Sequence, residues 1–278
     1  MDEQQLIEMG GRFLKLVGQH LGCLVVNYVA LDPNGNDLGE EHVASFSGFF
    51  IEMKGQWQFV TAGHVFDDED EGIETLRKAG RLRVTQARIV DCFGDGARDH
   101  LPTIISYDDV PKISIDNGKR GLDFAFLPLR DLYVNTIKAN GVVPFRPADW
   151  AEPAEGEVIA FGVVGFPEEE KQGANGDDRV DGWIRPILVW VRPCAPPENA
   201  PKTDYPLFVA EIPFSTPKSP KGMSGGAVIA LVRKDDGSTK YYLVGVQSSW
   251  NKVARVIYAC PMSSFFQFML DVIASEQE

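Results

Sequence analysis

The segment with the clearest potential for chemistry is a glycine-rich stretch that precedes an apolar run, Gly222-Met223-Ser224-Gly225-Gly226. Glycines allow positive φ and a close approach of the backbone to a substrate, so neighbouring N–H groups can converge on one point. Such a turn could present the Ser224 hydroxyl as a nucleophile while the N–H groups of Gly222 and Ser224 bind a developing oxyanion. An ordinary glycine-rich β-turn with a surface serine is the alternative that this segment alone leaves open.

A serine nucleophile needs a base that takes its proton as it attacks, and the chain has only 4 histidines. Three have surface explanations: His20 ends a predicted helix, where a cation is favoured, while His42 and His100 follow charged residues. His64 differs because it follows an apolar run and two small residues, Ala62 and Gly63, which leave room for an imidazole to reach a cleft. We therefore identify His64 as the candidate base, with a packed or capping histidine at a strand end as the alternative.

The third candidate is a carboxylate that would accept a hydrogen bond from the other imidazole nitrogen and fix its tautomer. Asp123 precedes the apolar run 124–129 at the start of a predicted strand. Burying an unpaired carboxylate is costly, so an acid in such a run usually has a specific partner. A strand-start aspartate that bonds its local backbone is the alternative.

The elements that must position these residues are mostly β-strands. From about residue 24 onward, short runs of Val, Ile, Phe and Tyr alternate with turn formers, which is typical of an all-β protein. The spacing predicts one hairpin from residues 47–53 and 56–61 and a second from residues 227–233 and 240–247.

Helices are expected mainly at the two ends of the chain. Residues 3–20 predict an amphipathic helix, and residues 263–274 predict a helix capped by Ser263 or Ser264. The proline-containing stretch 130–156 lacks sustained periodicity and is predicted to cross between two β-rich halves.

Three segments, in this order, resemble the signature segments of trypsin-like (chymotrypsin-fold) serine peptidases: Thr61-Ala62-Gly63-His64, Asp123-Phe124-Ala125-Phe126-Leu127 and Gly222-Met223-Ser224-Gly225-Gly226. The resemblance implies an all-β fold of two six-stranded antiparallel β-barrels with an N-terminal and a C-terminal helix. It implies a site in the cleft between the barrels, with His64 and Asp123 from the first half and Ser224 from the second. The expected divisions are 1–22 for the N-terminal helix, 23–135 and 136–262 for the barrels, and 263–278 for the C-terminal helix.

The resemblance also assigns roles near the serine. It implies an oxyanion hole formed by the N–H groups of Gly222 and Ser224, and a strand containing Gln247 and Ser248 that pairs with the substrate backbone. Met223 departs from secreted trypsins, which have an aspartate there that pairs with a freshly cut N-terminus. The chain also has no Ile-Val-Gly-Gly activation sequence, so it is more similar to intracellular or bacterial members that are active as made or switched by a partner.

A specificity pocket follows from the same resemblance. Lys218 stands six residues before Ser224 and is expected near the base of the pocket, with Ser249 and Trp250 at its entrance. A lysine at the base would favour an acidic side chain before the cut bond.

Composition restricts the partners. A formal net charge of −13 would repel phosphate backbones, so nucleic acids are poor partner candidates. The acidic, polar N-terminus lacks the pattern of a secretory signal and no apolar run is long enough to span a membrane, so we expect a cytoplasmic protein that does not bind membranes. The 4 cysteines show no C-x-x-C spacing, and no metal or cofactor is implied.

The sequence therefore predicts a serine endopeptidase that acts on a protein or peptide substrate through His64, Asp123 and Ser224. Two alternatives stay open. One is a binding module that keeps the fold and cleft without cutting. The other is a latent peptidase that a regulatory protein partner activates.

Overall fold

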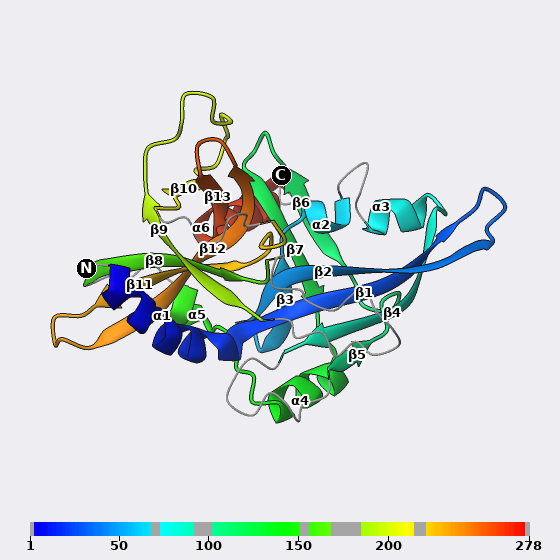
Figure 1. Ribbon diagram of the computed structural model, residues 1–278, viewed down its shortest axis with the longest axis horizontal. Helices are drawn as coiled ribbons and strands as arrows, with labels where there is room; N and C mark the ends of the chain where they lie inside the picture. The colour runs from blue at the N-terminus through cyan, green and yellow to red at the C-terminus, as the bar shows by residue number, and fades with distance from the viewer. Residues whose placement is uncertain are drawn as a thin grey trace.

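The computed structural model describes residues 3–67, 73–91, 102–150, 156–167, 185–213 and 221–275. The protein is mostly β, and its two β units lie side by side with helices around them (Figure 1). In chain order the elements are α1 (Glu3–Val17), the 3-10 helix η1 (Gly18–His20), β1 (Leu21–Leu31), β2 (Asp37–Met53), β3 (Gln56–Thr61), α2 (His64–Asp67), α3 (Ile73–Lys78), β4 (Leu82–Val90), β5 (Thr103–Ile105), β6 (Ile113–Asn117), β7 (Leu122–Pro128), α4 (Asp131–Ala139), α5 (Pro147–Trp150), β8 (Glu157–Gly165), β9 (Ile187–Pro193), β10 (Phe208–Glu211), β11 (Ala227–Arg233), β12 (Thr239–Asn251), β13 (Val256–Pro261) and α6 (Met262–Ser275).

The first unit is a 7-stranded sheet with the order β5-β4-β1-β2-β3-β7-β6. The predicted hairpin of β2 and β3 is confirmed, and its turn residues Lys54 and Gly55 have φ of 51° and 80°. Positive φ at both central positions matches the twist of a tight hairpin. The prediction of six strands is wrong for this half, because the 3-residue β5 pairs with β4 and is too short to show an alternating pattern in the sequence. Closure of this sheet into a barrel stays a prediction.

The second unit is a closed six-stranded barrel with the order β10-β13-β12-β11-β8-β9, as predicted for this half. The predicted hairpin of β11 and β12 is confirmed, and β11 also pairs with β8. A cluster of small and branched apolar side chains from these strands is buried together: Val163, Val189, Val191, Ala210, Val228, Ile257 and Ala259. The barrel is therefore a packed unit that can hold the segment before β11 rigidly.

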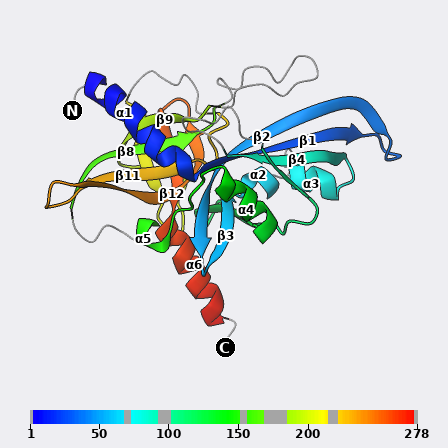
Figure 2. The ribbon, with the colours of Figure 1, turned by 90° about the horizontal axis from the view of Figure 1, so that it is seen from below.

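The N-terminal helix is confirmed as α1, which lies along the second unit beside β9 (Figure 2). Phe13 of α1 stacks on Trp190 of β9 with ring centroids 5.6 Å apart. In the described part of the chain, no helix combines the length and hydropathy that crossing a bilayer requires.

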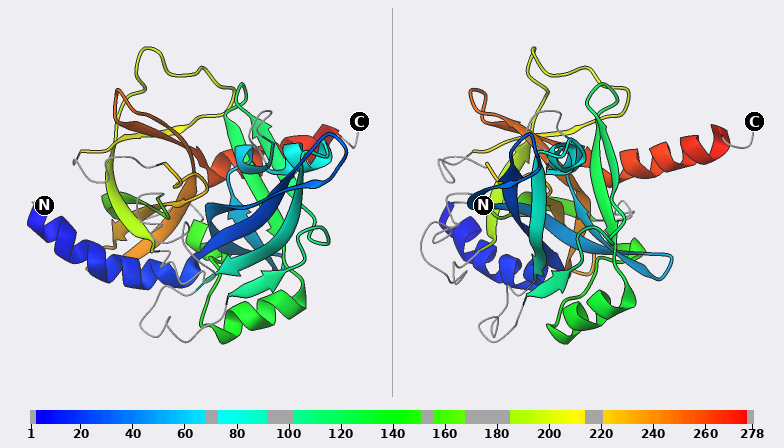
Figure 3. Two further views of the ribbon diagram at one scale, coloured as in Figure 1. Left: turned by 45° about the vertical axis from the view of Figure 1, so that its right-hand side comes forward. Right: turned by 90° about the vertical axis from the view of Figure 1, so that its right-hand side faces the viewer.

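The C-terminal helix is confirmed as α6, which extends away from the β units (Figure 3). The predicted cap is wrong, because the helix already begins at Met262 and both serines lie inside it. Ser264 is buried, and its Oγ donates to the carbonyl oxygen of Pro206 at 3.2 Å.

The crossing segment is more regular than the sequence indicated, since α4 and α5 lie within residues 130–156. Tyr133, Val134 and Ile137 of α4 are buried, so a short apolar stripe holds this helix against the first sheet. Three buried positions in a 9-residue helix are too few to show sustained periodicity in the sequence.

His20 is buried where α1, the crossing segment and the second barrel meet, so its expected surface location is wrong. Its Nδ1 lies 2.5 Å from the carbonyl oxygen of Val143, which requires a proton on Nδ1, and its Nε2 then accepts from the Tyr241 hydroxyl at 2.8 Å. The ring also stacks on Phe145 with centroids 4.0 Å apart. Burial in this apolar site lowers the pKa of His20 to about 4.

This depressed pKa predicts acid sensitivity of the fold. Between the unfolded pKa near 6.5 and the folded pKa of about 4, the unfolded chain binds the proton and the folded protein does not, so stability falls as pH falls. The full effect is about 3 kcal/mol at about 1.4 kcal/mol per pKa unit. We expect the free energy of unfolding of the wild type, from urea titrations between pH 7 and pH 4, to drop by at least that amount, because carboxylates with lowered pKa such as Asp123 add to the His20 contribution.

His20→Gln provides the control for this prediction, because an amide does not titrate in this range. Its free energy of unfolding at pH 7 should be lower than that of the wild type, and its decline toward pH 4 should be shallower by about 3 kcal/mol. Equal pH slopes for the two proteins would contradict the assignment.

Candidate active site

His64 and Asp123 lie together at one end of the first sheet. β3 ends at Thr61 and α2 begins at His64, while Asp123 is the second residue of β7, the neighbour of β3. The carboxylate accepts two hydrogen bonds from the histidine: Asp123 Oδ2 lies 2.8 Å from His64 Nδ1, and Oδ1 lies 2.9 Å from the His64 backbone nitrogen. Because an ionised carboxylate only accepts, the proton is on Nδ1, and a neutral ring keeps its lone pair on Nε2.

The close approach of these elements requires Gly63. A Cβ at this position would lie 2.7 Å from the carbonyl oxygen of Ile115, in β6. The small residue that the sequence shows before His64 therefore lets the turn after β3 pack against the neighbouring strands.

Asp123 is held in its charged form. Its residue is 6% exposed, and this burial alone would raise its pKa. Hydrogen bonds from the His64 ring, from Ser248 and from the His64 backbone oppose burial and lower the pKa of Asp123 below its usual value. The side chain of His64 is 33% exposed, so the pair has one buried partner and one that reaches solvent.

The Ser224 turn immediately precedes β11 in the second unit. Gly222 and Gly225 have φ of 85° and 88°, conformations that favour glycine. A Cβ on Gly225 would overlap Thr61 Oγ1 and the carbonyl oxygen of Ser47, so this glycine brings the turn against the first sheet near His64. The half-buried Ser224 donates its hydroxyl proton to the carbonyl oxygen of Ser248 at 3.0 Å.

Ser248 connects the three candidates across the two units. Its Oγ donates a short hydrogen bond to Asp123 Oδ2, and its carbonyl oxygen accepts from Ser224. The pairing of β12 with β13 shifts between Gln247 and Ser249, which leaves Ser248 at a β-bulge. A bulge can turn a side chain out of the ladder, and here it directs Ser248 to the carboxylate. The sequence assigned Ser248 to substrate contacts alone, and no signal in the sequence marks this bulge.

The other predicted substrate residues have mixed locations. The backbone of Gln247 pairs with the Ser224 turn, because Gln247 N donates to Gly226 O and Gln247 O accepts from Gly225 N, both at 2.8 Å. Ser249 is exposed, and Trp250 packs partly against the barrel core. Lys218, the predicted base of the pocket, lies outside the described residues. The specificity pocket therefore stays a prediction.

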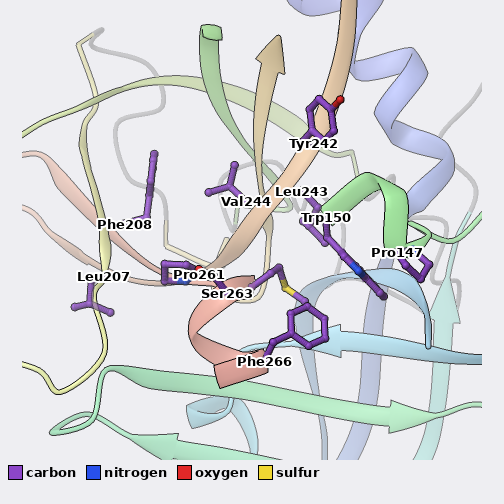
Figure 4. A pocket seen from close by; sticks show the side chains of 11 residues that line it. Pro147, Trp150, Leu207, Phe208, Tyr242, Leu243, Val244, Pro261, Ser263 and Phe266 are labelled. Atoms are coloured by element: carbon purple, nitrogen blue, oxygen red, sulfur yellow. The ribbon is translucent and has the colours of Figure 1, made fainter. Parts of the chain in front are cut away.

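An apolar cavity of about 650 Å³ lies elsewhere, where α5 and the start of α6 meet strands of the second barrel (Figure 4). Side chains from α5, β12 and the start of α6 surround it, among them Trp150, Tyr242, Val244 and Phe266. It shares no residue with the predicted specificity pocket.

Over the described ranges, no group of three or more His, Cys, Asp and Glu side chains is arranged to hold a metal ion. Cys194 and Cys260 are free thiols, Cys23 is buried, and Cys92 lies outside the described residues.

No family model matches the chain, and no curated protein matches it. Solved structures with a similar chain path include a protease named Anisep from Arthrobacter nicotinovorans, which is 15% identical, with a TM-score of 0.45 over 87% of this chain and 90% of that chain. A Glu endopeptidase in complex with MPD is 14% identical, with a TM-score of 0.46 over 90% of both chains. Deg5 is 12% identical, with a TM-score of 0.47 over 96% of this chain and 94% of that one. No function follows for this chain from identities and scores this low.

Proposed function

We propose that this chain is a serine endopeptidase in which Ser224 is the nucleophile, His64 the general base and Asp123 the acid that orients it. The observation that carries the proposal is that Ser248 contacts the candidates from both β units. Its carbonyl oxygen accepts from the Ser224 hydroxyl, and its own hydroxyl donates to Asp123, the partner of His64 Nδ1. A carboxylate bonded to Nδ1 of a histidine leaves Nε2 as the base, the arrangement that nucleophilic catalysis by serine requires.

The reaction would proceed by acyl transfer. Ser224 Oγ attacks the carbonyl carbon of the peptide bond, its proton passes to His64 Nε2, and the carbonyl oxygen becomes an oxyanion. The C–N bond then breaks as His64 donates that proton to the leaving amine. Water then attacks the acyl-enzyme with His64 again as the base, which releases the acid and restores Ser224. Asp123 stays ionised throughout, which agrees with its lowered pKa.

The oxyanion would bind to the Ser224 turn. The backbone N–H groups of Gly222 and Ser224 have no acceptor among the described residues, although neighbouring groups of the same turn are paired. Unpaired donors that converge at a reacting carbonyl are what stabilises the tetrahedral intermediate.

A latent peptidase is a second candidate, and one observation favours it. The Ser224 hydroxyl donates to Ser248 O, so its proton must turn toward His64 before attack. A partner or a bound substrate that displaces this hydrogen bond would then switch the site on.

Labelling with a fluorophosphonate tests the proposed function directly. The expected result is one phosphonyl adduct per chain, located at Ser224 by mass spectrometry of digested protein, with fluoride as the leaving group. Heat-unfolded wild type and Ser224→Ala should stay unlabelled. Labelling that requires another protein would favour the latent peptidase, and a folded protein that is never labelled or is labelled equally after unfolding would contradict both candidates.

A further inference from the structure

One serine of the first sheet contacts the turn that carries Ser224. Ser47 lies in β2 and is fully buried. Its Oγ donates to the carbonyl oxygen of Gly222 at 2.8 Å and accepts from the backbone nitrogen of Phe166 at 2.8 Å. One hydroxyl from the first unit thus bonds two segments of the second unit and uses both its donor and its acceptor capacity.

The backbone of Ser47 is also fixed. Its carbonyl oxygen accepts from Thr61 Oγ1 at 2.8 Å, in a buried hydrogen bond between β2 and β3. Thr61 is the last residue of β3, three positions before His64. Ser47 therefore lies between the strand that ends near the candidate base and the turn that presents the candidate nucleophile.

The contact with Gly222 determines the orientation of a peptide group in the Ser224 turn. Because a peptide group is planar, holding the Gly222 carbonyl oxygen fixes the plane of the bond to Met223. Glycine is compatible with many backbone conformations, so Gly222 does not select this one by its own preference. The buried Met223 side chain and the hydrogen bond from Gly226 N to Met223 O, at 2.8 Å, hold the next residue.

From these contacts we infer that Ser47 is a positioning residue for the oxyanion-binding N–H groups of the Ser224 turn. The inference rests on the proposed function and adds a dependence of that site on the contact between the two β units. Ser47 acts through Gly222 and does not touch the reacting atoms. Loss of its hydroxyl would let the peptide between Gly222 and Met223 rotate. This peptide lies between the two peptides that carry the Gly222 and Ser224 N–H groups, so its rotation would move these donors away from the developing oxyanion.

A control variant at Ser264 distinguishes a positioning role of Ser47 from a purely structural one. Ser264 is also a buried serine whose Oγ donates to a backbone carbonyl, that of Pro206 at 3.2 Å, and it lies in α6. Ser47→Ala and Ser264→Ala each leave a backbone carbonyl without its hydroxyl donor, and Ser47→Ala also removes the acceptor of the Phe166 N–H, so both should lower the free energy of unfolding. Only Ser47→Ala should change the Ser224 turn.

The kinetic test compares peptide hydrolysis with the binding of a peptide trifluoromethyl ketone, which forms a tetrahedral adduct that carries an oxyanion. We expect Ser47→Ala to lower kcat and ketone affinity by about 10- to 100-fold, somewhat less than the loss of one oxyanion donor, with KM changed by less than about 3-fold. Ser47→Cys keeps a weak donor and should lie between alanine and wild type. Equal losses in Ser47→Ala and Ser264→Ala, or wild-type kcat in Ser47→Ala, would overturn the inference.

A second measurement does not depend on catalysis. Amide hydrogen exchange in the peptide covering Met223, Ser224 and Gly225 should be faster in unliganded Ser47→Ala than in wild type or Ser264→Ala. If the wild type hydrolyses no peptide but Ser47→Ala still exchanges faster, the result would contradict the proposed function alone. Unchanged exchange in Ser47→Ala would overturn the role of Ser47 even in an active enzyme.

Discussion

Ser224→Ala is expected to abolish peptide hydrolysis, with kcat reduced by at least about 10⁴-fold. The methyl group has no lone pair with which to attack, and the hydroxyl that donates to Ser248 O beside the Asp123 and His64 pair is lost. The measurement is mass spectrometry of a peptide library incubated with each protein, followed by rates for one cleaved sequence. Hydrolysis by Ser224→Ala at the wild-type rate would remove the proposed nucleophile.

The same variant should fold normally and still bind substrate. Ser224 is half-buried, and within the described part of the chain its hydroxyl bonds only Ser248 O, so the loss of stability should be about 1 kcal/mol. Affinity for an uncleaved peptide, measured by titration calorimetry, should match the wild type. Ser264→Ala is the control for removal of a serine hydroxyl, because it should keep full hydrolysis.

The candidate site could be predicted from the sequence because each main residue has a local signature. Gly63 before His64, the apolar run after Asp123 and the glycines around Ser224 all arise from local constraints on the backbone or on burial. Such signatures can be recognised without knowledge of strand pairing. The structure brings His64 and Asp123 into direct contact and reaches Ser224 through a third residue.

Contacts between residues that are distant in the sequence could not be predicted. Ser47 and Ser248 are serines in ordinary β-strands, and their contacts join positions 175 and 125 residues apart. His20 was interpreted as a surface residue because its helix end was visible, whereas the Val143 and Tyr241 groups that bury it lie 123 and 221 residues away. Local patterns carry no information on such pairs, so the internal contacts of the site needed the fold.

Asp123→Asn is expected to lower kcat by about 10⁴-fold while the fold is kept. In the wild type, Oδ2 accepts from both His64 Nδ1 and Ser248 Oγ. An amide that keeps its oxygen toward the His64 backbone nitrogen places an NH₂ group against the ring. Nδ1 must then become the acceptor, and the proton moves to Nε2, which can no longer take the proton of Ser224.

Asp116→Asn is the matched control, because Asp116 is exposed in β6 and pairs directly opposite Asp123 across the β6 and β7 ladder. It removes the same charge at a neighbouring position and should keep kcat within about 2-fold, since exposed charges are strongly screened. Raising the pH of the assay should partly restore Asp123→Asn activity, because hydroxide can replace the missing base, but should not restore Ser224→Ala. An Asp123→Asn enzyme with wild-type kcat would show that the carboxylate does not orient His64, and it would leave the contact between them without a catalytic role.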